Sequence, residues 1–223
     1  MNVSDAIAAR RSIRGFLETP VAPDLIRSVL QKAARSPSGG NLQPWQIYVV
    51  GGESLRQLKA TMAERVAQAP EGEGPEFDIY PKQLGSPYRE RRFQVGEDMY
   101  ALLGIPREDR AGRLRWFARN YQFFDAPLAL FCYVDRGMGE AQWSDLGMFL
   151  QTVMLLLKEA GLDSCAQECW AMYWKTVGQA INPPENWQLF CGMAIGYADP
   201  DAPVNRLVTQ RAPLDEFVRF MDI

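Results

Sequence analysis

The chain has 223 residues, of which 47% are hydrophobic, and its formal net charge is −3. This length favours one domain with a substantial core, and the slight acidity argues against bulk attraction to nucleic acid. No apolar run reaches membrane-spanning length, and the start of the chain, Met1–Asp5, does not resemble a signal peptide. These features predict neither a membrane nor a nucleic-acid partner.

The sequence contains no histidine. This excludes Ser-His-Asp and Cys-His nucleophile systems, histidine zinc sites and imidazole acid–base catalysis, and we expect no metal site. The four cysteines form no C-x-x-C pair and are typical of reduced thiols, which predicts a cytoplasmic location. An enzyme of this composition would need a cofactor for difficult chemistry.

The first predicted elements are a short helix from Ser4 to about Arg10 and a helix that Pro23 opens. Between them, the segment Arg10–Arg14 holds three guanidinium groups and the Ser12 hydroxyl. A guanidinium group binds phosphate with two parallel hydrogen bonds and is always charged. Taken alone, however, the segment is more simply interpreted as a solvated basic corner.

The next segment, Ser36–Trp45, has neither a helical nor a strand period. Its two adjacent glycines allow a positive φ or a close approach to a ligand. Asn41 and Gln43 each offer hydrogen-bond donors and acceptors, which suits a planar heterocycle. An ordinary loop between the preceding helix and a predicted strand at 46–50 is the alternative.

A helix and then a long excursion follow that strand. We predict a helix from Ser54, a Pro- and Gly-rich stretch from Ala69 to Pro87, and then two charged or aromatic helical pieces that end near Tyr121. The basic cluster at 89–92 is interpreted as a solvated helix face. Residues from about 69 to 124 are expected to act as a lid or substrate wall.

The second half of the chain contains two buried strands, Leu128–Val134 and Leu189–Tyr197, and a short strand-like segment within Gly161–Glu168. The longest predicted helix, Trp143 to Glu159, is apolar nearly all round, which predicts cover by a partner subunit. Alternating helices and strands favour an α/β or α+β fold. The dinucleotide fingerprint and the P-loop are absent, so arginines and loops would have to hold a nucleotide-like cofactor.

These features, in this order, resemble the flavin-dependent nitroreductase family. The resemblance spans nearly the whole chain and rests on Arg10–Arg14, Ser36–Trp45, Gly161–Glu168, Gly196–Asn205 and Arg211–Leu214. It implies one α+β domain over residues 1–223, with a central, mostly antiparallel sheet flanked by helices. It also implies an intertwined homodimer with an exchanged C-terminal segment and flavin mononucleotide (FMN) at the subunit interface.

The resemblance also implies which residues contact FMN. The phosphate, ribityl and ring oxygens would meet Arg10, Arg11, Ser12, Arg14 and Arg211. A loop of the second subunit would contribute Pro37, Ser38, Gly39, Asn41 and Gln43. The reactive edge and pyrimidine ring would face Ala166, Gln167, Glu168, Cys169 and Asn120. Many relatives carry a lysine just beyond Asn120, whereas this chain does not, so Arg14 or Arg119 is expected to supply that charge.

The implied function is oxidoreduction with NADH or NADPH as hydride donor and a small nitroaromatic compound as acceptor. Ping-pong transfer through flavin N5 would use one flat slot, and a cation near N1–C2=O would stabilise the reduced flavin. Candidate stacking groups for the substrate are Tyr88, Phe93, Trp116 and Phe123, although core packing explains each about as well. Alternative functions are dehalogenation, enone or quinone reduction, flavin breakdown, or flavin binding without turnover.

Overall fold

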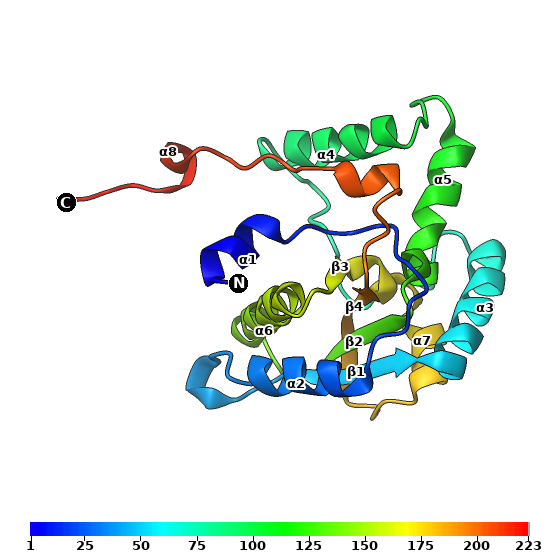
Figure 1. The fold of residues 1–223 in the computed structure, drawn as a ribbon, viewed down its shortest axis with the longest axis horizontal. Coiled ribbons are helices and arrows are strands. Elements are labelled where there is room, and N and C mark those ends of the chain that lie inside the picture. Colours follow the sequence, from blue (N-terminus) through cyan, green and yellow to red (C-terminus); the bar gives the residue numbers. More distant parts are fainter. Residues whose placement is uncertain (223) are drawn as a thin grey trace.

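The computed structural model describes residues 1–222. Within that range four strands form one antiparallel sheet in the order β1-β2-β4-β3. They are β1 (Gln46–Gly51), β2 (Leu128–Asp135), β3 (Asp163–Gln167) and β4 (Trp187–Gly196). Helices flank this sheet (Figure 1), so the expected α+β fold with an antiparallel sheet is confirmed.

Helices α2 (Pro23–Ala33) and α6 (Glu140–Glu159) cover one face of the sheet, and α1 (Val3–Ala9) packs on α6. The opposite face is covered by α3 (Gly52–Gln68), α7 (Trp174–Ile181) and the 3₁₀ segments η2 (Arg119–Asp125) and η3 (Glu168–Tyr173). Side chains of β2 alternate between the two cores, as the period of two in a strand requires.

Within one chain, helix α6 is buried on its inward side only. Its inward residues, Leu146, Phe149 and Val153 among them, are buried against the sheet and α2. Met148 on another side remains 40% exposed, and residues 154–156 are half-buried. One chain therefore buries only the inward side of this helix, and the expected cover by a partner subunit stays a prediction.

The helix after β1 begins earlier than expected. Helix α3 starts at Gly52 rather than at Ser54, because Gly52 adopts a φ of 57° and turns the chain directly out of the strand. Farther along are α4 (Tyr88–Leu102) and α5 (Arg110–Ala118), at the positions expected for the two helical pieces. None of the described residues of α4 is buried.

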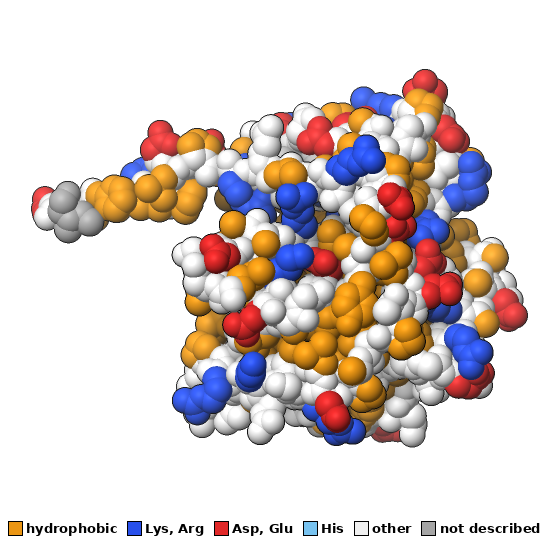
Figure 2. Space-filling view, viewed as in Figure 1, with side chains coloured by type: hydrophobic (Ala, Val, Ile, Leu, Met, Phe, Trp, Pro, Cys, Tyr) orange, Lys and Arg blue, Asp and Glu red, His pale blue; other side chains and the backbone are white. Residues whose placement is uncertain are grey.

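The last part of the chain forms a projecting arm, residues 207–222. After η4 (Pro203–Arg206) it runs past α4 to the short helix α8 (Leu214–Phe217) and beyond the body of the protein (Figure 1). Much of it is apolar and exposed (Figure 2): Val208, Leu214, Phe217, Phe220 and Met221 are each at least 55% exposed. Within residues 1–222, no helix has the length and hydrophobicity needed to cross a bilayer.

Candidate functional site

Two cavities meet at Arg14 and Leu207, which line both of them. The first, which we call the arginine cavity, has a volume of about 600 Å³ and gathers groups from both ends of the chain. Its polar lining residues are Arg10, Arg11, Ser12, Arg14, Gln151, Thr209 and Arg211. None of the described residues that line it is acidic. Four guanidinium groups without a facing carboxylate make this cavity suitable for an anion.

The backbone of the N-terminal segment is fixed by the middle and the end of the chain. Ser12 bridges to Ser164 of β3, and the Ile13 N–H donates to the Ser164 carbonyl at 3.0 Å. The Arg14 N–H donates to Asn205 Oδ1 at 2.8 Å, and Asn205 Nδ2 donates to the Gly15 carbonyl at 2.8 Å. Asn205 thus positions the segment that carries the arginines. The sequence motif contained Asn205, but its spacing gave no indication of this role.

Gly15 is required by close packing in the same segment. A Cβ at this position would lie 2.6 Å from the Cβ of Ala202. Any larger residue would therefore push the arginine segment away from the η4 region. The tight approach lets Asn205 reach the backbone on either side of the glycine.

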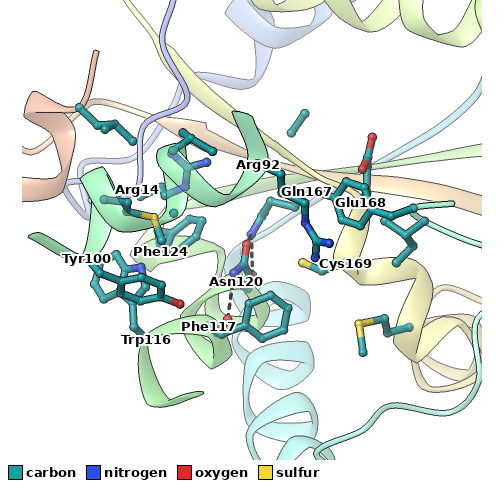
Figure 3. Close-up of a pocket in the computed structure, with 18 of the residues that line it drawn as sticks. Arg14, Arg92, Tyr100, Trp116, Phe117, Asn120, Phe124, Gln167, Glu168 and Cys169 are labelled. Carbon is teal, nitrogen blue, oxygen red and sulfur yellow. Dashed lines mark hydrogen bonds between the residues drawn. The ribbon is translucent and has the colours of Figure 1, made fainter. Parts of the chain in front are cut away.

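The second cavity, which we call the aromatic cavity, has a volume of about 800 Å³. One face of α4 forms part of its wall through residues at helical spacing: Arg92, Val95, Gly96, Met99 and Tyr100. Aromatic residues of α5 and η2 line it as well, and β3 with η3 supplies Ala166, Gln167, Glu168 and Cys169 (Figure 3). Such a cavity, apolar with a few polar groups, is typical of a site for a small organic ligand.

Two carboxamide side chains are fixed at the base of the aromatic cavity. Gln167 is 3% exposed, and its Nε2 donates to the carbonyl and to Oδ1 of Asn120 at 2.8 and 3.1 Å. Asn120 Nδ2 donates in turn to the Phe117 carbonyl at 2.9 Å (Figure 3). The structure therefore joins two residues that the sequence places 47 positions apart. Their mutual bonds hold one polar edge of the cavity in place.

Arg14 and Arg119 lie differently with respect to the aromatic cavity. Arg119 pairs with Asp125 at 2.6 Å and does not line either cavity, whereas Arg14 lines both. Which of the two arginines supplies charge to a flavin stays a prediction, and the cavity lining favours Arg14. Burial raises the pKa of Glu168, which also lines the cavity. Arg92 is a further lining cation that the sequence did not reveal, because it belongs to a cluster interpreted as a solvated face.

The four candidate stacking aromatics lie in different positions relative to the aromatic cavity. Trp116 lines the aromatic cavity and is half-buried. The expectation is wrong for Phe123, which has no exposed surface and stacks on Trp170 with ring centroids 4.4 Å apart. Tyr88 and Phe93 lie on α4, are 61% and 48% exposed and do not line the cavity. Their contact with a substrate stays a prediction.

The loop at 36–45 lies apart from both cavities. None of the residues expected to contact FMN from this loop lines either one, namely Pro37, Ser38, Gly39, Asn41 and Gln43. The loop is held against α6, because the Gly39 N–H donates to the buried Asp145 carboxylate and Trp45 stacks on Phe149. Asn41 and Gln43 adopt φ values of 59° and 51°. Such left-handed conformations of non-glycine residues cluster at functional sites.

The thiols and acidic groups provide no alternative chemistry among the described residues. No group of three or more Cys, Asp or Glu side chains within 1–222 is placed to hold a metal ion. Burial raises the pKa of Cys169, which lines the aromatic cavity, so its thiol stays protonated and is a weak nucleophile. The site therefore consists of an anion-binding half and a flat, largely apolar half.

An α+β fold with such a site is typical of a flavin-dependent oxidoreductase. The chain belongs to the nitroreductase family, whose model it matches over residues 7–197. It is 37% identical to a nitrobenzene nitroreductase of Ectopseudomonas oleovorans, across 98% of this chain and 96% of that protein. The family expected from the sequence is confirmed.

Two solved structures show the same fold. The FMN- and NADPH-dependent nitroreductase NfnB of Sphigopyxis sp. strain HMH is 49% identical, with a TM-score of 0.97 and complete coverage of both chains. The FMN-dependent NfnB of Mycobacterium smegmatis, in complex with NADPH, is 29% identical, with a TM-score of 0.93 and 98% coverage of both chains. The cofactor and hydride donor expected from the sequence agree with those of these relatives.

Proposed function

We propose that this protein is an FMN-dependent oxidoreductase that uses NADH or NADPH to reduce nitroaromatic compounds. The observation that carries the proposal is the junction at Arg14 of a cavity with four arginines and a larger aromatic cavity. FMN requires these two environments, because its phosphate is anionic and its ring system is flat. The nitroaromatic substrate class is supported by the relatives named above.

The residues of the two cavities fit the two ends of FMN. Arg10, Arg11, Ser12, Arg14 and Arg211 would hold the phosphate and adjacent oxygens, since guanidinium groups form charge-assisted bonds to phosphate. Asn120, Gln167 and the backbone of Ala166 and Glu168 would face the ring. The loop 36–45 would contribute its contacts from a second subunit.

When bound, FMN would supply ping-pong hydride transfer, accepting hydride at N5 from the nicotinamide and passing it to the nitro compound. The chain's own residues would prepare the site. Arg14 would place positive charge beside the ring, which favours a reduced, anionic ring system. Trp116 would stack on a flat substrate. The chain has no histidine, so protons would come from water.

We further propose that the protein is an intertwined homodimer in which the arm (207–222) is exchanged. The arm leaves the body with large apolar side chains exposed, and an isolated protein rarely displays such a surface (Figure 2). The exposed polar groups of the loop 36–45 lie beside α6, where a second subunit could place them at its partner's site. Sedimentation should give a dimer, and a flavin-bound monomer at micromolar concentration would contradict this proposal.

The excursion at 69–124 is proposed as the lid within one domain over residues 1–223. One face of α4 lines the aromatic cavity, and none of its described residues is buried. A helix held by so few buried contacts can move without unfolding the core. Substrate choice would then depend on α4 and α5 rather than on the arginine cavity.

Two measurements, made one after the other, test the proposed function. The absorbance spectrum of the purified protein should show a flavin band. Oxidation of NADH and of NADPH is then followed with and without nitrobenzene, and reciprocal plots should be parallel, as ping-pong kinetics requires. A flavin band without turnover would instead indicate a binding protein. Turnover with an enone, a quinone or a halogenated arene, but not with nitrobenzene, would indicate another flavin-dependent reduction.

A further inference from the structure

A third cavity, of about 520 Å³, lies between α7, the end of β2 and the loop that leads into β4. It shares no lining residue with the arginine or the aromatic cavity. Two tryptophans, Trp174 and Trp187, form much of its wall together with Leu189 and a pair of prolines. Its volume lies in the range of sites for small organic molecules, and its walls suit a flat ring.

Two buried oxygen atoms of this cavity have no hydrogen-bond partner among residues 1–222. One is the hydroxyl of Tyr133, whose residue is 2% exposed. The other is Oε2 of Glu76, whereas Oε1 of the same carboxylate accepts from Arg136 at 2.5 Å. Leaving such groups unpaired in a protein interior costs about 1–3 kcal/mol each. Both unpaired oxygens belong to residues that line the cavity, and a hydrogen-bond donor that reached them would satisfy them.

The two oxygens belong to one polar region. Burial, and to a smaller extent the nearby Tyr48 and Glu76, raises the pKa of Tyr133, so its hydroxyl stays neutral. The charged lining residues balance in number, since the acidic Glu76 and Glu185 are matched by the basic Arg136 and Lys175. A neutral lining with two unpaired acceptors favours an uncharged ligand that carries N–H donors.

We propose that this third cavity is a second ligand site, which binds a neutral primary arylamine. The amino group would donate to the Tyr133 hydroxyl oxygen and to Glu76 Oε2, while the ring lies against Trp174 or Trp187. Complete reduction of a nitroarene yields this class of compound, so the idea that the ligand is a product rests on the proposed function. The binding itself does not depend on that function.

Fluorine NMR can test this site directly. The flavin-loaded protein is labelled with 5-fluorotryptophan, and the resonances of its six tryptophans are assigned with single Trp→Phe variants. Titration with 4-chloroaniline should shift the Trp174 and Trp187 resonances saturably. Chlorobenzene, which has a similar ring but no N–H, should bind at least about tenfold more weakly. Trp116 reports separately on the aromatic cavity.

Tyr133→Phe removes the unpaired hydroxyl and should weaken binding of 4-chloroaniline about tenfold. Tyr48→Phe is the matched control, because the Tyr48 ring lies 5.7 Å from that of Tyr133 but does not line the cavity. It should leave the affinity unchanged. An unaltered resonance of the fully buried Trp170 would show that both variants are folded.

Three outcomes would overturn the proposal. If neither Trp174 nor Trp187 responds, or if Tyr133→Phe binds as tightly as the parent, an internal water satisfies the two oxygens. If only the Trp116 resonance moves, the amine binds in the aromatic cavity alone. No turnover is measured, so these results are distinct from success or failure of the nitroreductase assay.

Discussion

The arginine cavity and the α4 wall of the aromatic cavity are built in opposite ways. The arginine segment is bridged to β3 and bonded on both sides of Gly15 by Asn205. Helix α4 contributes one face to the aromatic cavity, although none of its described residues is buried. The difference predicts that anchoring of an anionic ligand will depend on the rigid arginine segment, whereas the choice of a second ligand will depend on the α4 wall, which can change.

The excursion is nevertheless fixed at its beginning. The side chain of Glu73 is 3% exposed and accepts hydrogen bonds from Arg65, from the Thr176 hydroxyl and from the N–H groups of Lys175 and Thr176. The last two donors belong to the first turn of α7, where a carboxylate is favoured. The segment that leads from α3 to the α4 wall is therefore firmly attached to α7.

The largest expected effect is a loss of stability, and it distinguishes a core residue from a residue of the α4 wall. Phe123→Ala should lower the free energy of unfolding by about 3–5 kcal/mol, because it removes a fully buried ring that stacks on Trp170. Phe93→Ala, on the exposed side of α4, should cost less than about 0.5 kcal/mol. Urea unfolding measures both values. Equal losses would mean that α4 is part of the cooperative core.

The arginines should affect cofactor binding most strongly. Arg10→Ala, Arg14→Ala and Arg211→Ala should each weaken FMN binding by about 1.5–3 kcal/mol, the range for a bond to a charged group. Arg89→Ala is the control, because Arg89 pairs with Glu90 and lines neither cavity. Flavin retention after dialysis gives the comparison. If all three variants kept their flavin, the arginine cavity would not bind the phosphate.

The stability that the Glu73 side chain contributes should depend on pH. Glu73→Gln should lower stability by about 1–2 kcal/mol near pH 7, since four bonds to a charged acceptor become weaker. Burial alone would raise the pKa of Glu73, but hydrogen bonds from Thr176 and Arg65 outweigh it and leave the pKa below its ordinary value. A lowered pKa stabilises the fold above the unfolded-state pKa, and this stabilisation is lost as pH falls through the folded-state pKa.

The difference between the parent and Glu73→Gln should therefore narrow below about pH 4. Unfolding curves recorded from pH 7 down to pH 3 measure it. The exposed Glu71 provides the matched control, and Glu71→Gln should have little effect at any pH. A deficit that stays constant into the acid range would show that the Glu73 charge contributes nothing.

The smallest expected effect is on substrate binding at Trp116, which lines the aromatic cavity. Trp116→Ala should raise KM for a nitroarene, or lower kcat/KM, about two- to tenfold, because a stacking partner contributes roughly 0.5–1.5 kcal/mol beyond its buried area. Flavin content should not change. Steady-state kinetics on flavin-saturated protein measures the effect. Loss of flavin in this variant would mean that Trp116 supports FMN binding instead.

Regular periods made the elements predictable. The apolar spacing of α2 and the continuous apolar runs of β2 and β4 gave these elements within a few residues of their observed ends. Helix α4 showed a weaker pattern, because the face that lines the cavity mixes Arg92 with apolar residues. A face that meets a cavity instead of a core leaves no clear hydrophobic period. For this reason the lining role of Arg92 was missed.

The site was predictable in part, and the limit is physical. The arginines were expected to converge because charged groups at both chain ends fit one anion, and the structure brings them to one cavity. Phe123 was misplaced because composition cannot distinguish a core aromatic from a stacking one. Its φ of 50° turns the chain locally, and Phe123 and Phe124 are both fully buried. Tertiary packing decided that outcome.

The bond between Arg14 and Asn205 also constrains how the protein is made. The two residues are 191 positions apart in the sequence. At about 5–20 residues per second, the ribosome adds Asn205 roughly 10–40 s after Arg14. During that interval the arginine segment lacks its bonds to Asn205, and the nascent chain lacks a finished anion cavity. Capture of an anionic ligand by the complete cavity must then follow synthesis of nearly the whole chain, because Arg211 lies beyond Asn205.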